Sequence, residues 1–346
     1  MSIDEDIHIR EAGRCGRITL TRPKALNALS YDMAMAVDGA LDSWGDGGAV
    51  DLILVDAEGD RAFCAGGDVA ELYRCGLDGD YSYGRKFWAD EYRMNAKIGE
   101  CAVPYVAIMD GIVMGGGAGI SVHGTHRVVT ERSMIAMPES AIGLIPDVGC
   151  SLPLAQAPGH LGEFLAMTGW RMNGADAIHA GFADIEVASV DLDELKSRLE
   201  KTADPTAIGA FARDGNEATL APHLDAIDRH FGQETALDCL LSLEADPSDF
   251  TRKAAEMIRR GCPLSVACSF ELVRNARTLA SVRQALVHEY RFTFRAMSDG
   301  DFLEGVRAQV IEKDRDPKWQ IRRLEDVSRA KIDAMLAPLG DDELEI

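Results

Sequence analysis

The 346-residue sequence predicts an α/β fold with a helical C-terminal region. Two segments, 62–73 and 103–123, share one layout in which a strand-like run ends in glycines and a helical pattern follows. Strands that alternate with helices are typical of crossover connections and a parallel sheet. After about residue 150 the strand-like runs become rare and helical patterns dominate. These observations together define the predicted fold class.

The N-terminal segment predicts the first elements of that fold. Residues 7–10 and 16–20 have the pattern of two short strands joined by a glycine-containing turn. A helix is expected after Ser30 as N-cap, because apolar residues recur at helical spacing up to Trp44. The apolar run 52–55 predicts a strand that is buried on both faces, as in a parallel sheet.

The length of the chain favours one large domain with an extension, or two domains. Glycine, proline and acidic residues gather between about 203 and 223. We therefore predict a core at residues 1–205 and a helical C-terminal region at residues 206–346.

Charge and cysteine content exclude several classes of partner. A formal net charge of -21 repels nucleic acid, and an anionic cofactor would need local cations, for which Arg22 and Lys24 are candidates. Eight scattered cysteines without a C-x-x-C pair indicate reduced thiols.

The acidic N-terminus has no signal-peptide or transit-peptide pattern, and no apolar run of about 18 residues predicts a membrane span. We expect a cytoplasmic protein.

The glycines at the ends of two strand-like runs could serve a carbonyl substrate. Glycine there lets the backbone approach a ligand and present free N–H groups, and two convergent donors form an oxyanion hole. The alternative is a pair of tight turns in which glycine supplies a positive φ. A phosphate-binding G-x-x-x-x-G-K-[ST] motif is absent, and Ile120 and Val122 break the dinucleotide-binding G-x-G-x-x-G pattern.

Four motifs in order along the chain carry a family resemblance: Arg22-Pro-Lys-Ala-Leu-Asn-Ala-Leu29, Ala62-Phe-Cys-Ala-Gly-Gly-Asp68, Asp110-Gly-Ile-Val-Met-Gly-Gly-Gly117 and Met137-Pro-Glu-Ser-Ala-Ile-Gly143. In these motifs the chain resembles the crotonase (enoyl-CoA hydratase/isomerase) superfamily. The resemblance implies a crotonase-like ββα superhelix core, with the N–H groups of Gly67 and Gly116 as the oxyanion hole. Of the two glutamates of the family's hydratases, one is present as Glu139 and the other is replaced by Gly119.

A second carboxylate follows in Ile145-Pro-Asp-Val-Gly149. Together with Gly119, this motif resembles the 3-hydroxyisobutyryl-CoA hydrolase subfamily. The likeness extends to Cys262-Pro-Leu-Ser265, His288-Glu-Tyr-Arg291 and Asp301-Phe-Leu-Glu-Gly-Val-Arg307. It implies hydrolysis of a small 3-hydroxyacyl-CoA thioester, as in valine degradation. The alternatives are hydration or isomerisation of an enoyl-CoA, and a catalytically silent acyl-CoA-binding protein.

The resemblance also implies roles for the carboxylates. Glu139 would act as a base or as a nucleophile, and Asp147 would position water or the substrate's 3-hydroxyl. If the two lie close together in a partly dry site, mutual repulsion should raise the pKa of one of them. We also expect Glu139 to share one pocket with the oxyanion hole. Glu91 matches a substrate-contacting position, although a solvated helix face is an alternative.

The coenzyme A moiety would lie along two segments of the first two motifs, at Lys24, Ala25, Leu26, Ala65, Gly66 and Asp68. The resemblance implies no metal or redox cofactor. Coenzyme A is part of the substrate and is therefore not counted as a cofactor. We expect no nucleic-acid or membrane partner. The acyl group, and whether the chain forms a homo-oligomer, stay open.

Overall fold

The computed structural model describes residues 6–215 and 217–346. Contacts group the chain into two compact units, neither of which is continuous in sequence. The first comprises Met1–Asp68, Asp90–Ile135 and Arg171–Thr219, and the second comprises Val69–Ala89, Ala136–Trp170 and Leu220–Ile346. Because these units are defined by contacts and not by independent folding, the boundary near residue 205 stays a prediction.

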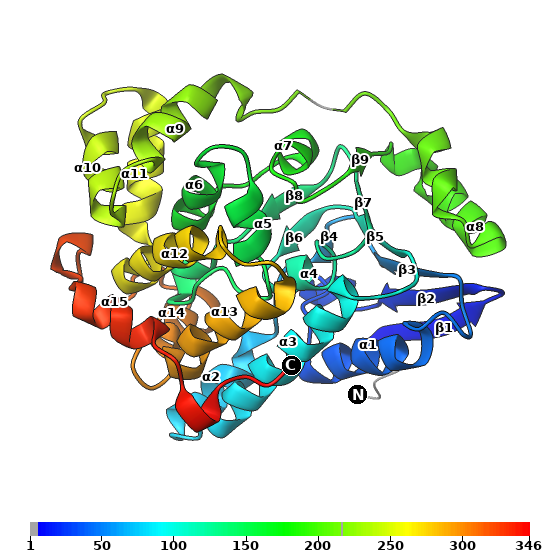
Figure 1. The fold of residues 1–346 in the computed structure, drawn as a ribbon, viewed down its shortest axis with the longest axis horizontal. Helices are drawn as coiled ribbons and strands as arrows, with labels where there is room; N and C mark the ends of the chain where they lie inside the picture. The colour runs from blue at the N-terminus through cyan, green and yellow to red at the C-terminus, as the bar shows by residue number, and fades with distance from the viewer. Residues whose placement is uncertain (1–5, 216) are drawn as a thin grey trace. The chain divides into compact units, whose positions relative to one another are not determined.

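A six-stranded sheet forms the centre of the first unit (Figure 1). Its order is β1-β2-β3-β5-β7-β9, with β1 and β2 antiparallel and the other neighbouring strands parallel. The strands are β1 (Ile7–Ala12), β2 (Cys15–Leu20), β3 (Leu52–Ala57), β5 (Tyr105–Met109), β7 (His126–Val129) and β9 (Ile185–Glu186). The predicted parallel sheet and N-terminal hairpin are confirmed.

The central strands are apolar because both of their faces are buried. Residues 52–56 of β3 and all of β5 are buried, as is usual for strands of a parallel sheet. The register places Val55 opposite Ile18 of β2 and Ala107 of β5. The predicted strand at 52–55 therefore occupies the middle of the sheet.

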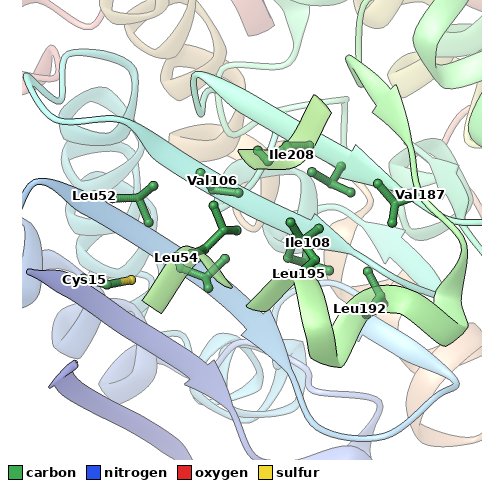
Figure 2. Close-up of a cluster of buried hydrophobic side chains, with 11 residues drawn as sticks. Cys15, Leu52, Leu54, Val106, Ile108, Val187, Leu192, Leu195 and Ile208 are labelled. Atoms are coloured by element: carbon green, nitrogen blue, oxygen red, sulfur yellow. The ribbon is translucent and has the colours of Figure 1, made fainter. Parts of the chain in front are cut away.

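Helix α8 (Leu192–Thr202) packs on this sheet through three leucines, of which Leu192 and Leu195 are labelled in Figure 2. Leu192, Leu195 and Leu199 recur at helical spacing, and all three join a buried cluster with Leu54 and Ile108 of the sheet. Asp193 and Glu194 in the first turn and Lys201 in the last complement the helix dipole. This packing holds residues 192–202 against the sheet, a segment that none of the sequence motifs covers.

A second, three-stranded sheet carries the glycine segments of the first unit. Its order is β4-β6-β8, from β4 (Ala62–Cys64), β6 (Ile112–Met114) and β8 (Met134–Ala136). The helices of this unit, beside α8, are α1 (Tyr31–Trp44), α4 (Gly116–Gly119) and α7 (Gly174–His179). The Ser30 hydroxyl accepts a hydrogen bond from the Met33 N–H, so the predicted N-cap of α1 is confirmed. Helix α3 (Ser82–Gly99) contributes residues to both units.

The second unit is helical. Besides the first part of α3, it contains α2 (Val69–Leu77), α5 (Ser151–Gln156), α6 (Leu161–Thr168), α9 (Leu224–Phe231), α10 (Ala236–Glu244), α11 (Asp249–Arg260), α12 (Pro263–Ala276), α13 (Val282–Ala296), α14 (Phe302–Val306) and α15 (Arg329–Leu336). Helix α12 is buried on most of its surface and contacts α5 and α6. It is therefore the central helix of this unit, and the predicted helical C-terminal region is confirmed.

Candidate active site

The two segments predicted to hold coenzyme A lie side by side in the first unit. The Ala65 N–H donates to the Leu26 carbonyl at 3.0 Å, and the Leu29 N–H donates to the Gly66 carbonyl at 2.9 Å. Asn27 connects the first of these segments to the chain that precedes the second, because its side-chain amide donates to the backbone carbonyls of Glu58 and Ala62. The structure therefore brings the predicted residues 24–26 and 65–68 together.

The cations beside these segments differ in their availability. Arg22 approaches Asp68 at 3.2 Å and Asp6 at 3.5 Å, so its charge is shared between two carboxylates. Lys24 and Ala25 are exposed, and Ala65, Gly66 and Asp68 are half-buried. Lys24 is thus the cation that an anionic ligand could reach most easily.

Gly67 and Gly116, the predicted oxyanion-hole residues, are neighbours. A Cβ added at Gly116 would lie 3.4 Å from the Gly67 nitrogen. Gly116 is the first residue of α4, where a helix leaves its N–H groups without an intrahelical partner. The bridge between Leu29 and Gly67 uses the Gly66 carbonyl and the Asp68 N–H, so the Gly67 N–H takes no part in it. The geometry is that of two adjacent backbone donors.

Glycine is required here for two different reasons. Gly66 and Gly115 have φ values of 118° and 46°, which residues other than glycine rarely adopt. At Gly117 the reason is space, since a Cβ would lie 2.2 Å from the Cys64 carbonyl oxygen. Tight turns and a close backbone approach therefore occur in the same segments.

Glu91 lies beside Gly116, one of the two predicted oxyanion-hole glycines. Its Oε1 would be 3.0 Å from a Cβ at Gly116. The residue is only 4% exposed, so the alternative of a solvated helix face is wrong. A carboxylate at this position can accept a hydrogen bond from a substrate hydroxyl.

The cysteine of the first glycine motif is no candidate nucleophile. Burial raises the pKa of the Cys64 thiol to about 12, and the Glu91 charge adds to that shift. Because the thiolate is the reactive form, a thiol with this pKa is unreactive near neutral pH.

Glu139 lies in the second unit, at the start of a 3₁₀ turn that runs from Glu139 to Ile142. It is 5% exposed, and its Oε2 has no hydrogen-bond partner within residues 6–215 and 217–346. Burial, then the charge of Asp147 and to a smaller extent that of Glu289, raise the pKa of the Glu139 carboxyl well above its ordinary value. The predicted rise of one pKa in this pair is confirmed, with burial as the larger cause.

Asp147 is the first residue of a tight turn and is 4% exposed. The Cys150 N–H donates to the Asp147 carbonyl at 2.9 Å, and both central residues, Val148 and Gly149, have positive φ values. The Cys150 thiol is buried as well, and burial raises its pKa well above the ordinary value. The groups available for chemistry here are therefore carboxylates.

Glu289 is a third buried carboxylate near this pair, and the sequence reasoning assigned it no role. It lies on α13 and accepts hydrogen bonds from the N–H groups of Gly149 and Ser151 at 2.6 Å and 2.9 Å. Burial raises the pKa of the Glu289 carboxyl from 4.5 to about 7, although these hydrogen bonds lower it. The only signal of Glu289 in the sequence was the motif His288-Glu-Tyr-Arg291, which carries part of the family resemblance.

The other C-terminal motifs support the Glu139 turn. The Cys262 N–H donates to the Ser140 carbonyl at 2.8 Å. A Cβ at Gly143 would meet the Asp301 carbonyl oxygen at 2.5 Å, and one at Gly305 would meet the Ile142 backbone at 2.2 Å. These motifs therefore pack against the segment that carries Glu139. That Glu139 shares one pocket with Gly67 and Gly116 stays a prediction.

The adjacent backbone donors and the buried carboxylates described above are the kinds of group that acyl-group chemistry on a thioester requires. A family model described as enoyl-CoA hydratase/isomerase matches residues 15–336. The chain therefore belongs to the enoyl-CoA hydratase/isomerase family.

Relatives within this family are more specific. The chain is 37% identical to the mitochondrial 3-hydroxyisobutyryl-CoA hydrolase of Gallus gallus, over 99% of this chain and 91% of that protein. It is 35% identical to 3-hydroxyisobutyryl-CoA hydrolase 1 of Arabidopsis thaliana, over 96% and 92%. The predicted resemblance to the 3-hydroxyisobutyryl-CoA hydrolase subfamily is confirmed.

Solved structures confirm the crotonase-like fold. A crystal structure described as an enoyl-CoA hydratase from Rhodobacter sphaeroides 2.4.1 has a TM-score of 0.94 and 45% identity, covering 99% of this chain and 100% of that chain. One described as a carnitinyl-CoA dehydratase from Mycobacterium thermoresistibile has a TM-score of 0.94 and 39% identity, covering 99% and 98%.

The predicted cytoplasmic location is wrong, because the matching animal relatives are named mitochondrial enzymes. Reduced cysteines indicate only a compartment that keeps thiols reduced, and they do not distinguish one such compartment from another. Within the described residues, no helix is long and apolar enough to span a membrane.

Proposed function

We propose that this protein hydrolyses the thioester of 3-hydroxyisobutyryl-CoA to 3-hydroxyisobutyrate and coenzyme A, the reaction of valine degradation. The observation that carries the proposal is the buried Glu139, whose pKa is raised beside Asp147. A raised pKa moves the Glu139 carboxyl from its acidic ordinary value in the direction of neutral pH, and a base is most effective when its pKa lies near the working pH. The full-length similarity to proteins named 3-hydroxyisobutyryl-CoA hydrolase supports the choice of substrate.

The carbonyl of the thioester accepts hydrogen bonds from the N–H groups of Gly67 and Gly116. Their adjacency supports this role, because donors fixed before the reaction stabilise the negative charge that develops on the oxygen. The pantetheine and nucleotide parts of coenzyme A lie along residues 24–26 and 65–68, with Lys24 available to their phosphates.

Glu139 removes a proton from water, and the resulting hydroxide attacks the carbonyl carbon. The tetrahedral intermediate then breaks its carbon–sulfur bond, and the proton held by Glu139 leaves with the thiolate as free coenzyme A thiol. Asp147 holds the substrate's 3-hydroxyl, and Glu91 contacts the acyl group beside the oxyanion hole. If Glu139 acts instead as a nucleophile, hydroxylamine should trap its acyl anhydride as a Glu139 hydroxamate.

Hydration of an enoyl-CoA is the second candidate, favoured by the enoyl-CoA hydratase description of a structure that is 45% identical. Adding water across a double bond requires two positioned acid–base groups. Here Gly119, within a helix of small buried residues, stands where the family's hydratases carry the first of them. This difference favours the hydrolase.

The test measures free thiol release from matched substrates. We expect 3-hydroxyisobutyryl-CoA and 3-hydroxypropionyl-CoA to be hydrolysed faster than isobutyryl-CoA and propionyl-CoA, which lack only the hydroxyl. Crotonyl-CoA, assayed for loss of its conjugated double bond, reports hydratase activity. Equal thiol release with and without the hydroxyl refutes this substrate, and rapid hydration without thiol release identifies the second candidate.

A further inference from the structure

Glu289 connects α13 to the turn that carries Asp147. The residue has no exposed surface and belongs to the middle of α13. One carboxylate oxygen accepts from the Gly149 N–H at 2.6 Å, and the other accepts from the Ser151 N–H at 2.9 Å and from the Ser151 hydroxyl. A side chain 138 to 140 residues away thus binds both sides of Cys150.

The turn that it binds has an unfavourable backbone. Its closing hydrogen bond runs from the Cys150 N–H to the Asp147 carbonyl, and Val148 and Gly149 between them have φ values of 53° and 83°. Two central residues with positive φ are characteristic of a type I′ turn, in which Asn, Asp and Gly dominate. A β-branched residue such as Val148 is a rare exception there, so the surrounding structure must impose the conformation.

We propose that Glu289 is a positioning residue that fixes the Asp147–Cys150 turn and thereby the Asp147 carboxylate. The proposal rests on the roles of Glu139 and Asp147 in the proposed function. It goes beyond them because it explains how a strained turn is maintained at a residue that must be placed accurately. Displacements of about 1 Å at a catalytic group can reduce a rate about 100-fold.

The interaction requires a carboxylate with two accepting oxygens. A glutamine has one accepting oxygen and one NH₂ group, and that NH₂ would face the N–H of either Gly149 or Ser151. Two donors would then oppose each other in a buried place, which is costly. Glu289 also interacts electrostatically with Asp147, Glu139 and the Cys150 thiol, so its charge reaches the proposed base.

Glu163 provides a matched control. It is equally buried, lies in the same unit, and is paired at 2.8 Å with both Arg274 and Arg277. Its replacement by glutamine removes a buried carboxylate and its ion pairs without removing a contact to the Asp147 turn. Any general effect of losing a buried charge therefore appears in Glu163→Gln as well.

The experiment is a double-mutant cycle on thiol release from 3-hydroxyisobutyryl-CoA. We expect Glu289→Gln to lower kcat about 30-fold in the wild-type background but less than about threefold in the Asp147→Asn background, because Glu289 acts through Asp147. Glu163→Gln should change kcat by less than about threefold in both backgrounds. Equal losses from Glu289→Gln in both backgrounds, or no loss at all, overturn the proposal.

Hydrogen exchange gives a reading that does not depend on activity. Amides of residues 147–152 should exchange at least about tenfold faster in Glu289→Gln than in the wild type. In Glu163→Gln their exchange rates should equal those of the wild type. If Glu289→Gln does not fold, Ser151→Ala removes the hydroxyl donor alone. It should lower kcat about threefold to tenfold and speed exchange at 147–152, and wild-type values for both overturn the proposal.

The same assay separates this proposal from the proposed function. A wild-type protein without thiol release, or an Asp147→Asn variant with full kcat, refutes the proposed function, and hydrogen exchange then still decides the role of Glu289. A large loss in Asp147→Asn with no loss in Glu289→Gln refutes the positioning role alone.

Discussion

One methyl group added at Gly116 should disable the proposed oxyanion hole while leaving the protein folded. In Gly116→Ala the new Cβ would lie 3.0 Å from the Glu91 Oε1 and 3.4 Å from the Gly67 nitrogen. The first contact is tighter than carbon and oxygen normally make, and the second places the methyl group in van der Waals contact with the other predicted backbone donor. Loss of one oxyanion-hole donor costs roughly 3 kcal/mol of transition-state stabilisation, so kcat should fall about 100-fold.

The assay is thiol release together with chemical denaturation, and Gly39→Ala is the matched control. Gly39 lies inside α1, and apart from its chain neighbours and the adjacent backbone of α1, none of the described residues comes within 4 Å of an added Cβ. Alanine there should raise the free energy of unfolding by about 0.5–1 kcal/mol and leave kcat unchanged. A Gly116→Ala protein within threefold of the wild-type kcat would refute the assignment of the oxyanion hole.

Three further predictions concern the carboxylates. Asp147→Asn should move the acidic limb of the kcat/KM profile of the residual activity to lower pH, because the Asp147 charge raises the pKa of Glu139. Glu289 should contribute about 3 kcal/mol to the free energy of unfolding at low pH, and this contribution should be lost as pH rises from about 4.5 to about 7. In urea denaturation, the free energy of unfolding should therefore fall less across this range in Glu289→Gln than in the wild type. The sign follows because a raised folded-state pKa stabilises the fold below the unfolded pKa, and this stability is lost as pH rises through the folded one. Gly119→Glu should not restore thiol release to Glu139→Gln, but it should introduce some hydration of crotonyl-CoA.

Each of these outcomes has a contrary result. If the acidic limb of the kcat/KM profile does not move in Asp147→Asn, the Asp147 charge does not raise the pKa of Glu139. An unfolding free energy that rises between pH 4.5 and 7 in the wild type, but not in Glu289→Gln, would contradict a raised pKa for Glu289. Thiol release restored by Gly119→Glu would mean that a carboxylate at that position can replace Glu139.

The sequence predicted those parts of the fold in which the local pattern and the tertiary environment agree. The helix after Ser30 has both an N-cap and regularly spaced apolar residues, and the strand at 52–55 is apolar because both faces are covered. The two glycine segments were recognised because close backbone approach leaves glycine as the only residue that fits, as at Gly117. Here a local motif contains the physical constraint.

The role of Glu289 could not be predicted from local patterns. Its partners at Gly149 and Ser151 are 138 to 140 residues away, and a glutamate in a helix is usually solvated. The strain at Val148 was equally hidden, because nothing in the local sequence assigns valine a positive φ. For Glu91, the pattern of α3 did not distinguish a buried carboxylate from an exposed one.

The measurement that tests the central claim most directly is the turnover of Glu139→Gln on 3-hydroxyisobutyryl-CoA. The amide keeps the size of the side chain but cannot accept a proton from water, so kcat should fall at least about 100-fold. Because Glu139 is buried with a raised pKa, the neutral amide should leave the protein folded and at least as stable near neutral pH. A folded Glu139→Gln protein that retains near wild-type thiol release would contradict the account, since its proposed base would then be dispensable.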